Sequence, residues 1–328
     1  MIQLLGIRLR EEIILLGFFS LMLATCNTIP AQGEPILREV NDFLIQLQEI
    51  TLAALAAAEY DLLIIDYSEN GSASGEWSQK QIQRLKKSKG GKQVLAYISI
   101  GEAERYRFYW QDGWAPGNPG WMGKENPNWT GNYKVKYWDS EWQQIVFSYL
   151  DRILDQGFDG IYMDIVDGYW YWASEAVESG EDEQLPSARD AADRMVDFIL
   201  EIAQYCRDGR GKRSFILCPQ NATGIITDAS KDKTIAFLSA IDAVGVEDVF
   251  YHGSRDEDNP YNPQEDVISH LRRFTSNGKR VFNIEYLTPG NRQAVDRFYS
   301  LSKKNGYVPF AAERALDHIR INPGHEPD

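Results

Sequence analysis

Acidic side chains stand at the ends of several short apolar segments of this 328-residue sequence. The clearest case follows the turn at Gly157, where an apolar run ends in Asp164. A lone aspartate in such a place commonly caps the next helix. Asp66, Glu247 and Glu285 occupy equivalent places, and like charges gathered in one cavity raise one another's pKa and cost stability. Such a cluster therefore indicates a functional site more readily than a device for folding.

Paired carboxylates beside aromatic residues, without a cofactor, are best suited to glycoside hydrolysis. One carboxylate attacks the anomeric carbon or activates water, and the other, held protonated, donates to the leaving oxygen. Strand alternation selects Glu247 over its neighbour Asp248, so we predict Asp164 and Glu247 as the catalytic residues. Glu285 stays open as an alternative acid. Side chains two strands apart lie roughly 5–6 Å from each other, which favours retention, but the sequence does not fix that distance.

Strand alternation also predicts which other side chains surround these acids. Polar residues recur at or near the inward end of almost every predicted strand. We expect no metal ion and no cofactor, because the sequence holds four His and no CxxC or HExxH pattern. The predicted substrate-binding residues are Gln46, Asp66, Tyr67, Tyr97, Glu102, Tyr162, Asp167, Trp170, Gln220, Tyr251, Glu285 and Tyr286.

Segments of strand type alternate with segments of helical type along most of the chain. This order predicts a single-domain (β/α)8 TIM barrel. An open doubly wound sheet is the alternative, and no Gly-rich phosphate or dinucleotide loop follows an early strand to support it. The predicted strands are 43–47, 62–66, 94–100, 160–164, 215–220, 243–247, 281–286 and 308–310. The predicted helices are 52–58, 79–87, 141–155, 188–207, 234–240, 265–276 and 293–304.

Two connections are longer than a barrel needs. Residues 105–139 follow the third predicted strand and residues 168–187 follow the fourth, and both are rich in Trp and Tyr. We interpret these aromatic-rich loops as walls of a substrate cleft, because long loops in compact domains are commonly functional. The alternative is that they only shield the barrel mouth. Trp170 is correspondingly either a sugar platform or a residue that packs on the rim.

The amino terminus predicts an exported protein. Arg8 and Arg10 precede an apolar run over 13–24, which has the length of a signal-peptide core and is short for a membrane span. The run leads to Cys26, a candidate site of lipid attachment to the membrane, with an ordinary signal, cleaved or uncleaved, as the alternative. We therefore expect a secreted or surface-anchored protein. The predicted divisions are a signal peptide over 1–26, a linker over 27–40, the barrel over 41–320 and a tail over 321–328.

Composition limits the partners. The 34 Lys and Arg against 48 Asp and Glu give a net charge of −14, which disfavours nucleic acid and suits a neutral or cationic partner. A polysaccharide is the partner that the carboxylates and aromatic rings favour, and we expect a monomer. Cys206 and Cys218 are predicted to be two separate buried thiols, with one disulfide as the alternative.

Several blocks of this sequence resemble a known family. They are Gln46, the strand ending in Asp66 with Tyr67 and Ser68, residues 94–104, residues 157–164 and residues 306–311. Over about residues 40–317 the chain is similar to glycoside hydrolase family 114, and most to its bacterial extracellular branch. The resemblance implies a TIM barrel with endo-α-1,4-polygalactosaminidase activity.

The same resemblance implies roles for individual residues. It makes Asp164 the nucleophile and Glu247 the acid/base, and it puts Asp66 and Glu102 in sugar-binding subsites. Two functional classes remain: a retaining endo-glycosidase, whether of this or of another polysaccharide specificity, and a surface lipoprotein that binds polysaccharide without cleaving it. Two carboxylates of opposed protonation favour the enzyme.

Overall fold

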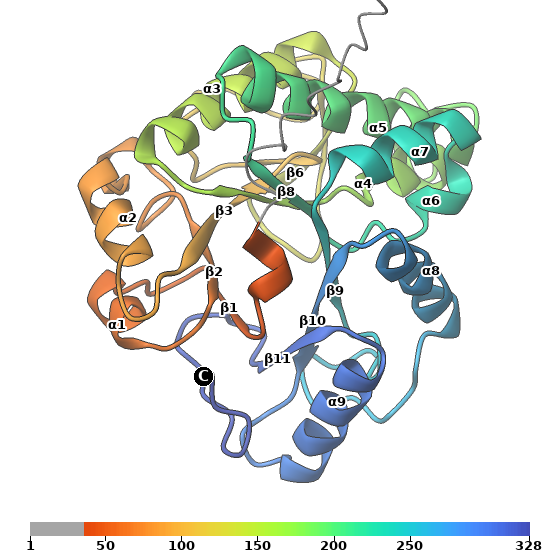
Figure 1. Cartoon of the computed structure of the whole chain (residues 1–328). Coiled ribbons are helices and arrows are strands. Elements are labelled where there is room, and N and C mark those ends of the chain that lie inside the picture. The colour runs from red at the N-terminus through yellow and green to blue at the C-terminus, as the bar shows by residue number, and fades with distance from the viewer. Residues whose placement is uncertain (1–35) are drawn as a thin grey trace, which may run out of the picture. The chain divides into compact units, whose positions relative to one another are not determined.

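A computed structural model describes residues 36–328, which belong to one compact unit. The predicted signal peptide and Cys26 lie outside the described residues. Eight parallel strands surround a central axis, with helices outside them (Figure 1). Five form the ladder β1 (Phe43–Gln46), β2 (Leu62–Asp66), β3 (Gln93–Ser99), β7 (Gly160–Asp164) and β8 (Ile216–Pro219). The other three are β9 (Ala243–Glu247), β10 (Arg280–Tyr286) and β11 (Val308–Ala312).

The two ladders meet along two seams. At the first, a parallel bridge joins Gln220 to Gly245, and the Asp242 amide donates to the Leu217 carbonyl over 2.9 Å. At the second, the ring of Phe43 in β1 packs 5.6 Å from that of Phe310 in β11. Together with their order in sequence, these contacts define the predicted (β/α)8 TIM barrel.

The helices on the outside bury their apolar residues against the strands. In α8, for example, Ile268, Leu271 and Phe274 recur at helical spacing and are buried. Ser78 and Gln81 form a capping box that fixes the start of α2. The helices are α1 (Leu52–Ala57), α2 (Gln79–Lys86), α3 (Ser140–Gln156), α4 (Gly168–Trp170), α5 (Ala188–Gln204), α6 (Ile225–Asp228), α7 (Lys231–Ala240), α8 (Glu265–Ser276) and α9 (Arg292–Lys304). None of these helices is both long and apolar enough to cross a membrane.

Short elements cover the ends of the barrel. The 3-10 turn η1 (Ile36–Glu39) lies over the amino-terminal end, where Arg280 donates to the Val40 carbonyl (Figure 1). A second 3-10 turn, η2 (Ala73–Gly75), follows β2, and π-helical turns follow α4 (η3, Tyr171–Glu175) and α5 (η4, Tyr205–Gly209). Beyond β11, Asn322 is buried and its side-chain amide donates to the Ala311 carbonyl.

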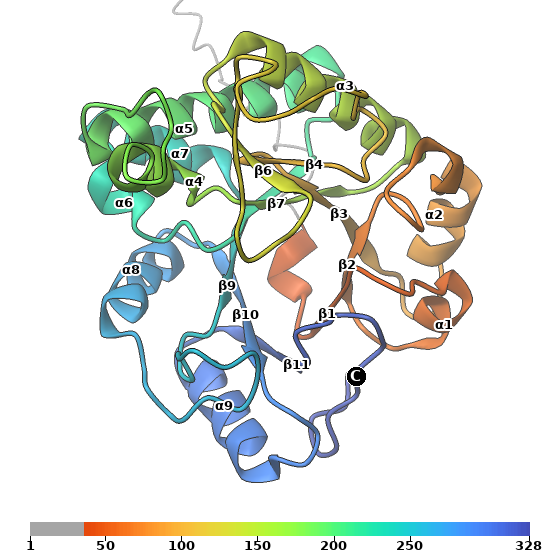
Figure 2. The same cartoon turned by 180° about the vertical axis from the view of Figure 1, so that it is seen from behind.

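The two long loops contain structure that the sequence did not predict. The segment after β3 forms an antiparallel sheet in the order β4 (Glu102–Glu104), β6 (Asn132–Val135) and β5 (Met122–Glu125). In the reverse view, β4 and β6 lie in front of the barrel strands (Figure 2). The segment after β7 forms α4 and η3. Both belong to the carboxyl-terminal side of the barrel, as predicted, but they are ordered elements with their own hydrogen bonds.

The strand register decides which side chains point inward, because paired residues of neighbouring strands share a face. Asp66 is paired with Tyr97, and Ser99 with Asp164. Glu247 is paired with Ile284, so Tyr286 shares the inward face and Glu285 the outward one. The prediction that Glu285 points inward is therefore wrong. The same holds for Gln46, which is paired with Ile65 and not with the inward Asp66.

Candidate active site

Asp164 ends β7 at the carboxyl-terminal mouth of the barrel and is half-buried. The Tyr97 hydroxyl of β3 donates to its Oδ2 over 2.6 Å, and the Ile165 amide donates to its Oδ1 over 2.8 Å. Burial raises the pKa of Asp164 to about 8, and the negative charges of Glu247 and Asp167 act in the same direction. The two hydrogen bonds oppose this rise, since they stabilise the ionised form.

Glu247 ends β9 and is also half-buried. Its Oε2 accepts a 2.8 Å hydrogen bond from the Asn221 amide, whose own oxygen accepts from the Glu247 backbone N–H. Its Oε1 accepts from the Tyr286 hydroxyl of β10. Arg314 lies 3.6 Å from the centre of the Tyr286 ring. Each predicted catalytic carboxylate is thus held in place by a tyrosine from another strand.

The backbone turns sharply after three successive strands at this mouth. Ile165, Asn221 and Asp248 all have positive φ, at 56°, 60° and 54°. For the β-branched Ile165 this conformation is strained, and strain of this kind gathers at functional sites. Because the chain turns at once, the preceding side chains of Asp164 and Glu247 remain at the mouth and do not continue into the loops.

Tyr162 fills the barrel interior below the two acids. A Cβ built on Gly245 of β9 would lie 2.0 Å from the Tyr162 hydroxyl oxygen, so only glycine leaves room for this ring. The hydroxyl is buried and makes no protein hydrogen bond. Burial raises the pKa of Tyr162 well above its usual value, with contributions from Cys218, Glu247 and Asp164. Tyr162 is therefore a packing residue in the barrel interior beneath the acids. The sequence had predicted a substrate contact for it instead.

Asp66 lies at the same mouth of the barrel, but its carboxyl group already forms an ion pair. Arg107, fully buried, donates to Asp66 Oδ2 over 2.6 Å and to Glu104 Oε2 over 2.6 Å. Burial raises the pKa of Asp66, and the Arg107 charge opposes that rise. The Arg107 guanidinium lies 5.8 Å from the ring centre of Tyr97, the partner of Asp164. Asp66 thus ends β2 in an ion cluster with Arg107 and Glu104.

A second acidic group lies beside β6. Glu102 Oε1 accepts from Lys134 over 2.6 Å and from Asn126 over 2.8 Å, while Oε2 is buried without a protein partner. Although Asp167 is partly exposed, desolvation by the protein around its carboxyl group raises its pKa to about 6. Lys134 opposes that rise, and the charges of Glu247 and Glu102 add to it. These contributions put Asp167 in the electrostatic environment of both Glu247 and Glu102.

Four residues predicted as substrate contacts lie elsewhere. Gln46 donates to the carbonyls of Gln48, Glu49 and Asp317, because it faces out of the barrel. Tyr67 follows the strand end, and its buried ring packs against Tyr149 of α3. Tyr251 is buried and donates to the Ala294 carbonyl of α9. These three side chains bind or pack against other parts of the protein and do not face the mouth, and the same holds for Glu285.

Glu285 supports the loop after β9. Its Oε1 accepts from the Phe250 amide over 2.6 Å, and burial raises its pKa to about 8. On the same outward face of β10, Asn283 donates to Ser302 of α9. A fully buried outward carboxylate cannot reach a substrate, which removes Glu285 as an alternative acid.

The remaining predicted contacts stay at the mouth. Gln220 follows β8 on the inward face and is bridged to Gly245. Trp170 of α4 is exposed and stacks on Tyr169 with ring centres 6.0 Å apart. Most of the loop tryptophans pack instead: Trp121 lies against Trp114 and Trp142 at about 5 Å. The aromatic loops therefore form a packed wall with few exposed rings.

Sequence reasoning missed four polar residues that order the site: Asn221, Arg107, Lys134 and Arg314. Asn221 carried a signal, since asparagine is enriched at positive φ and here it follows a strand end. The three cations carried no such signal, because Arg107 meets Asp66, Lys134 meets Glu102 and Arg314 meets Asp248 across long stretches of chain. Cys206 and Cys218 are free buried thiols, as predicted.

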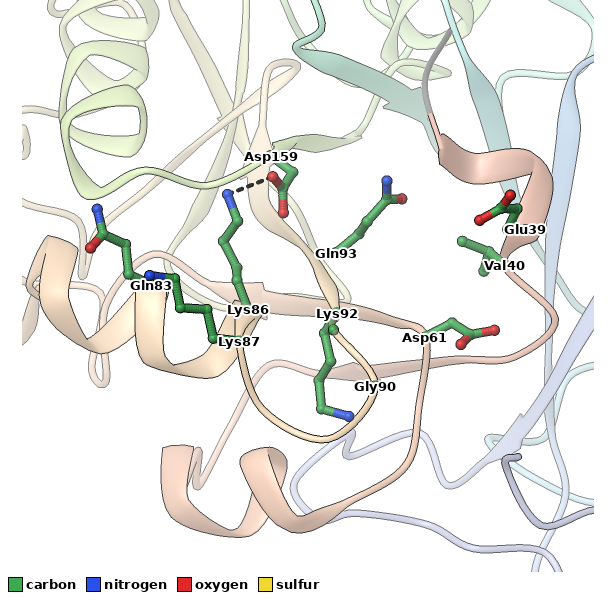
Figure 3. A pocket seen from close by; sticks show the side chains of 11 residues that line it. Glu39, Val40, Asp61, Gln83, Lys86, Lys87, Gly90, Lys92, Gln93 and Asp159 are labelled. Carbon is green, nitrogen blue, oxygen red and sulfur yellow. Dashed lines mark ion pairs between the residues drawn. The ribbon is translucent and has the colours of Figure 1, made fainter. Parts of the chain in front are cut away.

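Within residues 36–328, no three His, Cys, Asp or Glu side chains are grouped as a metal site requires. A hollow of about 720 Å³ lies at the other end of the barrel, where Asp61, Gln93 and Asp159 precede or begin strands (Figure 3). An ion pair of 2.6 Å joins Asp159 to Lys86 there. We assign the chemistry to the opposite end, where Asp164 and Glu247 lie.

Comparison with known proteins identifies the family. The model of glycoside hydrolase family GH114 matches residues 26–326. This chain belongs to family GH114. The family match identifies it as a glycoside hydrolase and agrees with the resemblance found in its sequence blocks.

Relatives of this GH114 chain include the uncharacterized protein MJ1477 of Methanocaldococcus jannaschii, 41% identical over 281 residues, covering 84% of this chain and 76% of that protein. An uncharacterized protein of Thermotoga maritima is 35% identical over 322 residues, covering 96% and 93%. Among solved structures, the glycoside hydrolase domain of PelA from Pseudomonas aeruginosa gives a TM-score of 0.62 at 18% identity, covering 86% of this chain and 98% of that one. Aspergillus fumigatus Ega3 in complex with galactosamine gives 0.59 at 18%, covering 89% and 97%. At such identity these structures support the fold.

Proposed function

We propose that this GH114 chain is an extracellular endo-glycosidase that cleaves α-1,4-linked, galactosamine-containing polysaccharide with retention of configuration. The observation that carries the proposal is the arrangement of Asp164 and Glu247. They end β7 and β9, are both partly open to solvent, and each accepts hydrogen bonds on both oxygens. Support for the sugar comes from Ega3, whose structure holds galactosamine, and from the net charge of −14, which suits a cationic polymer.

In the first step Asp164 is the nucleophile and Glu247 the general acid. An Asp164 oxygen forms a bond to the anomeric carbon while the bond to the glycosidic oxygen breaks. Glu247 gives its proton to that oxygen, so the leaving chain departs as a neutral alcohol. In the second step the Glu247 carboxylate takes a proton from water, the water oxygen bonds to the anomeric carbon, and Asp164 is released.

This cycle requires a pair of carboxyl groups that share one proton. The raised pKa of Asp164, about 8, means that the pair keeps a proton through neutral pH. The hydrogen bonds from Tyr97 and Ile165 favour an ionised Asp164, and an ammonium group on the bound sugar would favour it further. The proposed first step requires that this proton pass from Asp164 to Glu247, which then gives it to the leaving oxygen.

The proposed location rests on the sequence. An exported polymer-degrading enzyme needs a leader, and residues 1–26 have the signal-peptide pattern with Cys26 as the candidate lipid attachment site. Mass spectrometry of the mature protein from its native host would find either a lipid-modified Cys26 or an unmodified cleaved terminus. A chain that retains residues 1–25 and is found inside the cell would contradict export through this leader.

The direct test of function is release of reducing ends from a partly deacetylated galactosamine polymer. Wild type is expected to release them, while Asp164→Asn and Glu247→Gln are expected to lose 10²-fold or more, roughly the contribution of a catalytic carboxyl group. If all three proteins bind the polymer and none releases reducing ends, the chain is a polysaccharide-binding protein for this substrate. An oligosaccharide array would then identify which sugars it recognises.

A further inference from the structure

Among the described residues, a few large aromatic side chains are more than a third exposed. They are Tyr106 at 51%, Trp129 at 55%, Trp170 at 45% and Tyr261 at 39%. Exposed rings are the surfaces on which sugar rings stack, but a ring that must first be ordered loses affinity to entropy. An exposed ring that is already held in place therefore binds a sugar at the lowest cost in entropy.

Tyr106 is held from three directions. Its hydroxyl donates to Glu104 Oε1 over 2.6 Å, and the Arg107 guanidinium lies 4.6 Å from its ring centre. The Gly71 backbone, with a φ of 77°, closes on the ring so tightly that a Cβ there would lie 2.4 Å from Tyr106 Cδ2. Half of the side chain nevertheless remains in solvent. Its orientation is thus fixed before any ligand arrives.

Tyr106 is also linked to the predicted nucleophile, Asp164, through Arg107 and Tyr97. The same Arg107 guanidinium lies 5.8 Å from the ring centre of Tyr97, whose hydroxyl donates to Asp164. Tyr106 contributes to the raised pKa of the Tyr97 hydroxyl, as Asp164 does. Two tyrosines therefore contact one buried arginine, one at the nucleophile and one facing solvent.

We propose that Tyr106 forms a further subsite, on which the hexosamine residue adjoining the one attacked by Asp164 stacks with its C–H face. The proposal rests on the proposed polysaccharide hydrolase function. Behind the ring, two carboxyl groups, those of Asp66 and Glu104, contact the single cation of Arg107. These acidic neighbours and the electron-rich ring both favour a sugar with an ammonium group.

The test compares Tyr106→Ala with a matched control, Tyr261→Ala. Tyr261 is also exposed and lies over an arginine, Arg297 at 3.5 Å, but it packs on Tyr251 in the loop after β9. Reducing-end release from the galactosamine polymer is measured as kcat and KM. Tyr106→Ala is expected to raise KM about 3- to 10-fold, as loss of one stacked or cation–π contact would. Tyr261→Ala is expected to match wild type, and Tyr106→Phe, which keeps the ring, to fall between.

Each outcome bears on a different claim. If wild type cleaves the polymer and Tyr106→Ala has the same KM as Tyr261→Ala, the subsite is overturned and the hydrolase function stands. If wild type binds the polymer without cleaving it, the hydrolase function fails for this substrate, and the dissociation constants of the same variants decide the subsite. If wild type neither binds nor cleaves, both are overturned.

Discussion

The hydrogen bond from Tyr97 to Asp164 leads to a quantitative prediction for the pKa of Asp164. Tyr97→Phe removes the 2.6 Å donor from Asp164 Oδ2 and leaves only the Ile165 amide. A hydrogen bond to a charged group contributes about 1.5–3 kcal/mol. Since about 1.4 kcal/mol corresponds to one pKa unit, the pKa of Asp164 should rise by about one to two units above its value of about 8.

The sign of the pH effect follows from the shared proton. The active pair holds one proton, and activity falls at high pH when that proton leaves, near pH 8 in wild type. In Tyr97→Phe the high-pH limb of kcat/KM should move to about pH 9–10. The rate at pH 7 should fall about 10- to 150-fold, because ionised Asp164 becomes harder to form.

The assay is kcat/KM against pH on one galactosamine substrate, so that titration of the substrate amine is the same for every variant. Tyr149→Phe is the matched control. Tyr149 is buried and lies 5.6 Å from the same arginine, Arg107, but its hydroxyl has no hydrogen-bond partner. A Tyr97→Phe profile whose high-pH limb coincides with that of wild type would refute the reasoning, whatever the loss in rate.

Other variants test the remaining elements of the site. The folded state keeps a proton on Asp164 that the unfolded state releases above about pH 4, so the free energy of unfolding falls as pH rises toward 8. Asp164→Asn removes this effect and should stabilise the protein by about 1–3 kcal/mol at pH 7 and hardly at all at about pH 4. Urea unfolding at the two pH values measures the difference. Glu285→Gln should keep the wild-type kcat and pH profile, since the outward carboxyl group is mostly protonated at neutral pH; a loss as large as that of Glu247→Gln would return it to the catalytic pair. Gly245→Ala should displace the Tyr162 ring and lower stability on the order of 1–3 kcal/mol together with kcat, whereas an unchanged melting temperature would show that the barrel interior has room.

The barrel was predictable because its signals are local. Apolar strands alternate with amphipathic helices, and β2, β7, β9 and α8 have the predicted bounds. The ends of the other elements differ by a few residues, where hydrogen bonding in the folded chain decides. The antiparallel sheet after β3 was not predicted, since its strands are short and lie in a sequence rich in Gly, Pro and Trp.

The inward face of a strand was predictable only where the sequence of that strand distinguishes its two faces. In β7 and β9, glycine and a terminal acid mark one face. Every residue of β1 is buried, and so is nearly all of β10, so no polar and apolar alternation fixes the phase there. The inward placement of Gln46 and Glu285 was wrong for that reason, and Tyr286 is the residue of β10 that reaches Glu247.

Long-range pairing accounts for the rest. Asp66 has the position expected of a site residue, but the sequence could not show that Arg107, 41 residues away, would bind it. Asn221 likewise meets Glu247 only because β8 and β9 are neighbours. The acids at strand ends can be identified from the sequence alone. The groups that orient these acids come near them only when the barrel closes.

The central claim is that Asp164 is the nucleophile of a retaining pair, and a covalent intermediate tests it most directly. Glu247→Gln should still react with α-galactosaminyl fluoride, which needs no acid to leave, and then hydrolyse slowly because the base is missing. Mass spectrometry should find one hexosamine residue on the peptide that contains Asp164. No adduct under turnover, or an adduct on another residue, would contradict the account.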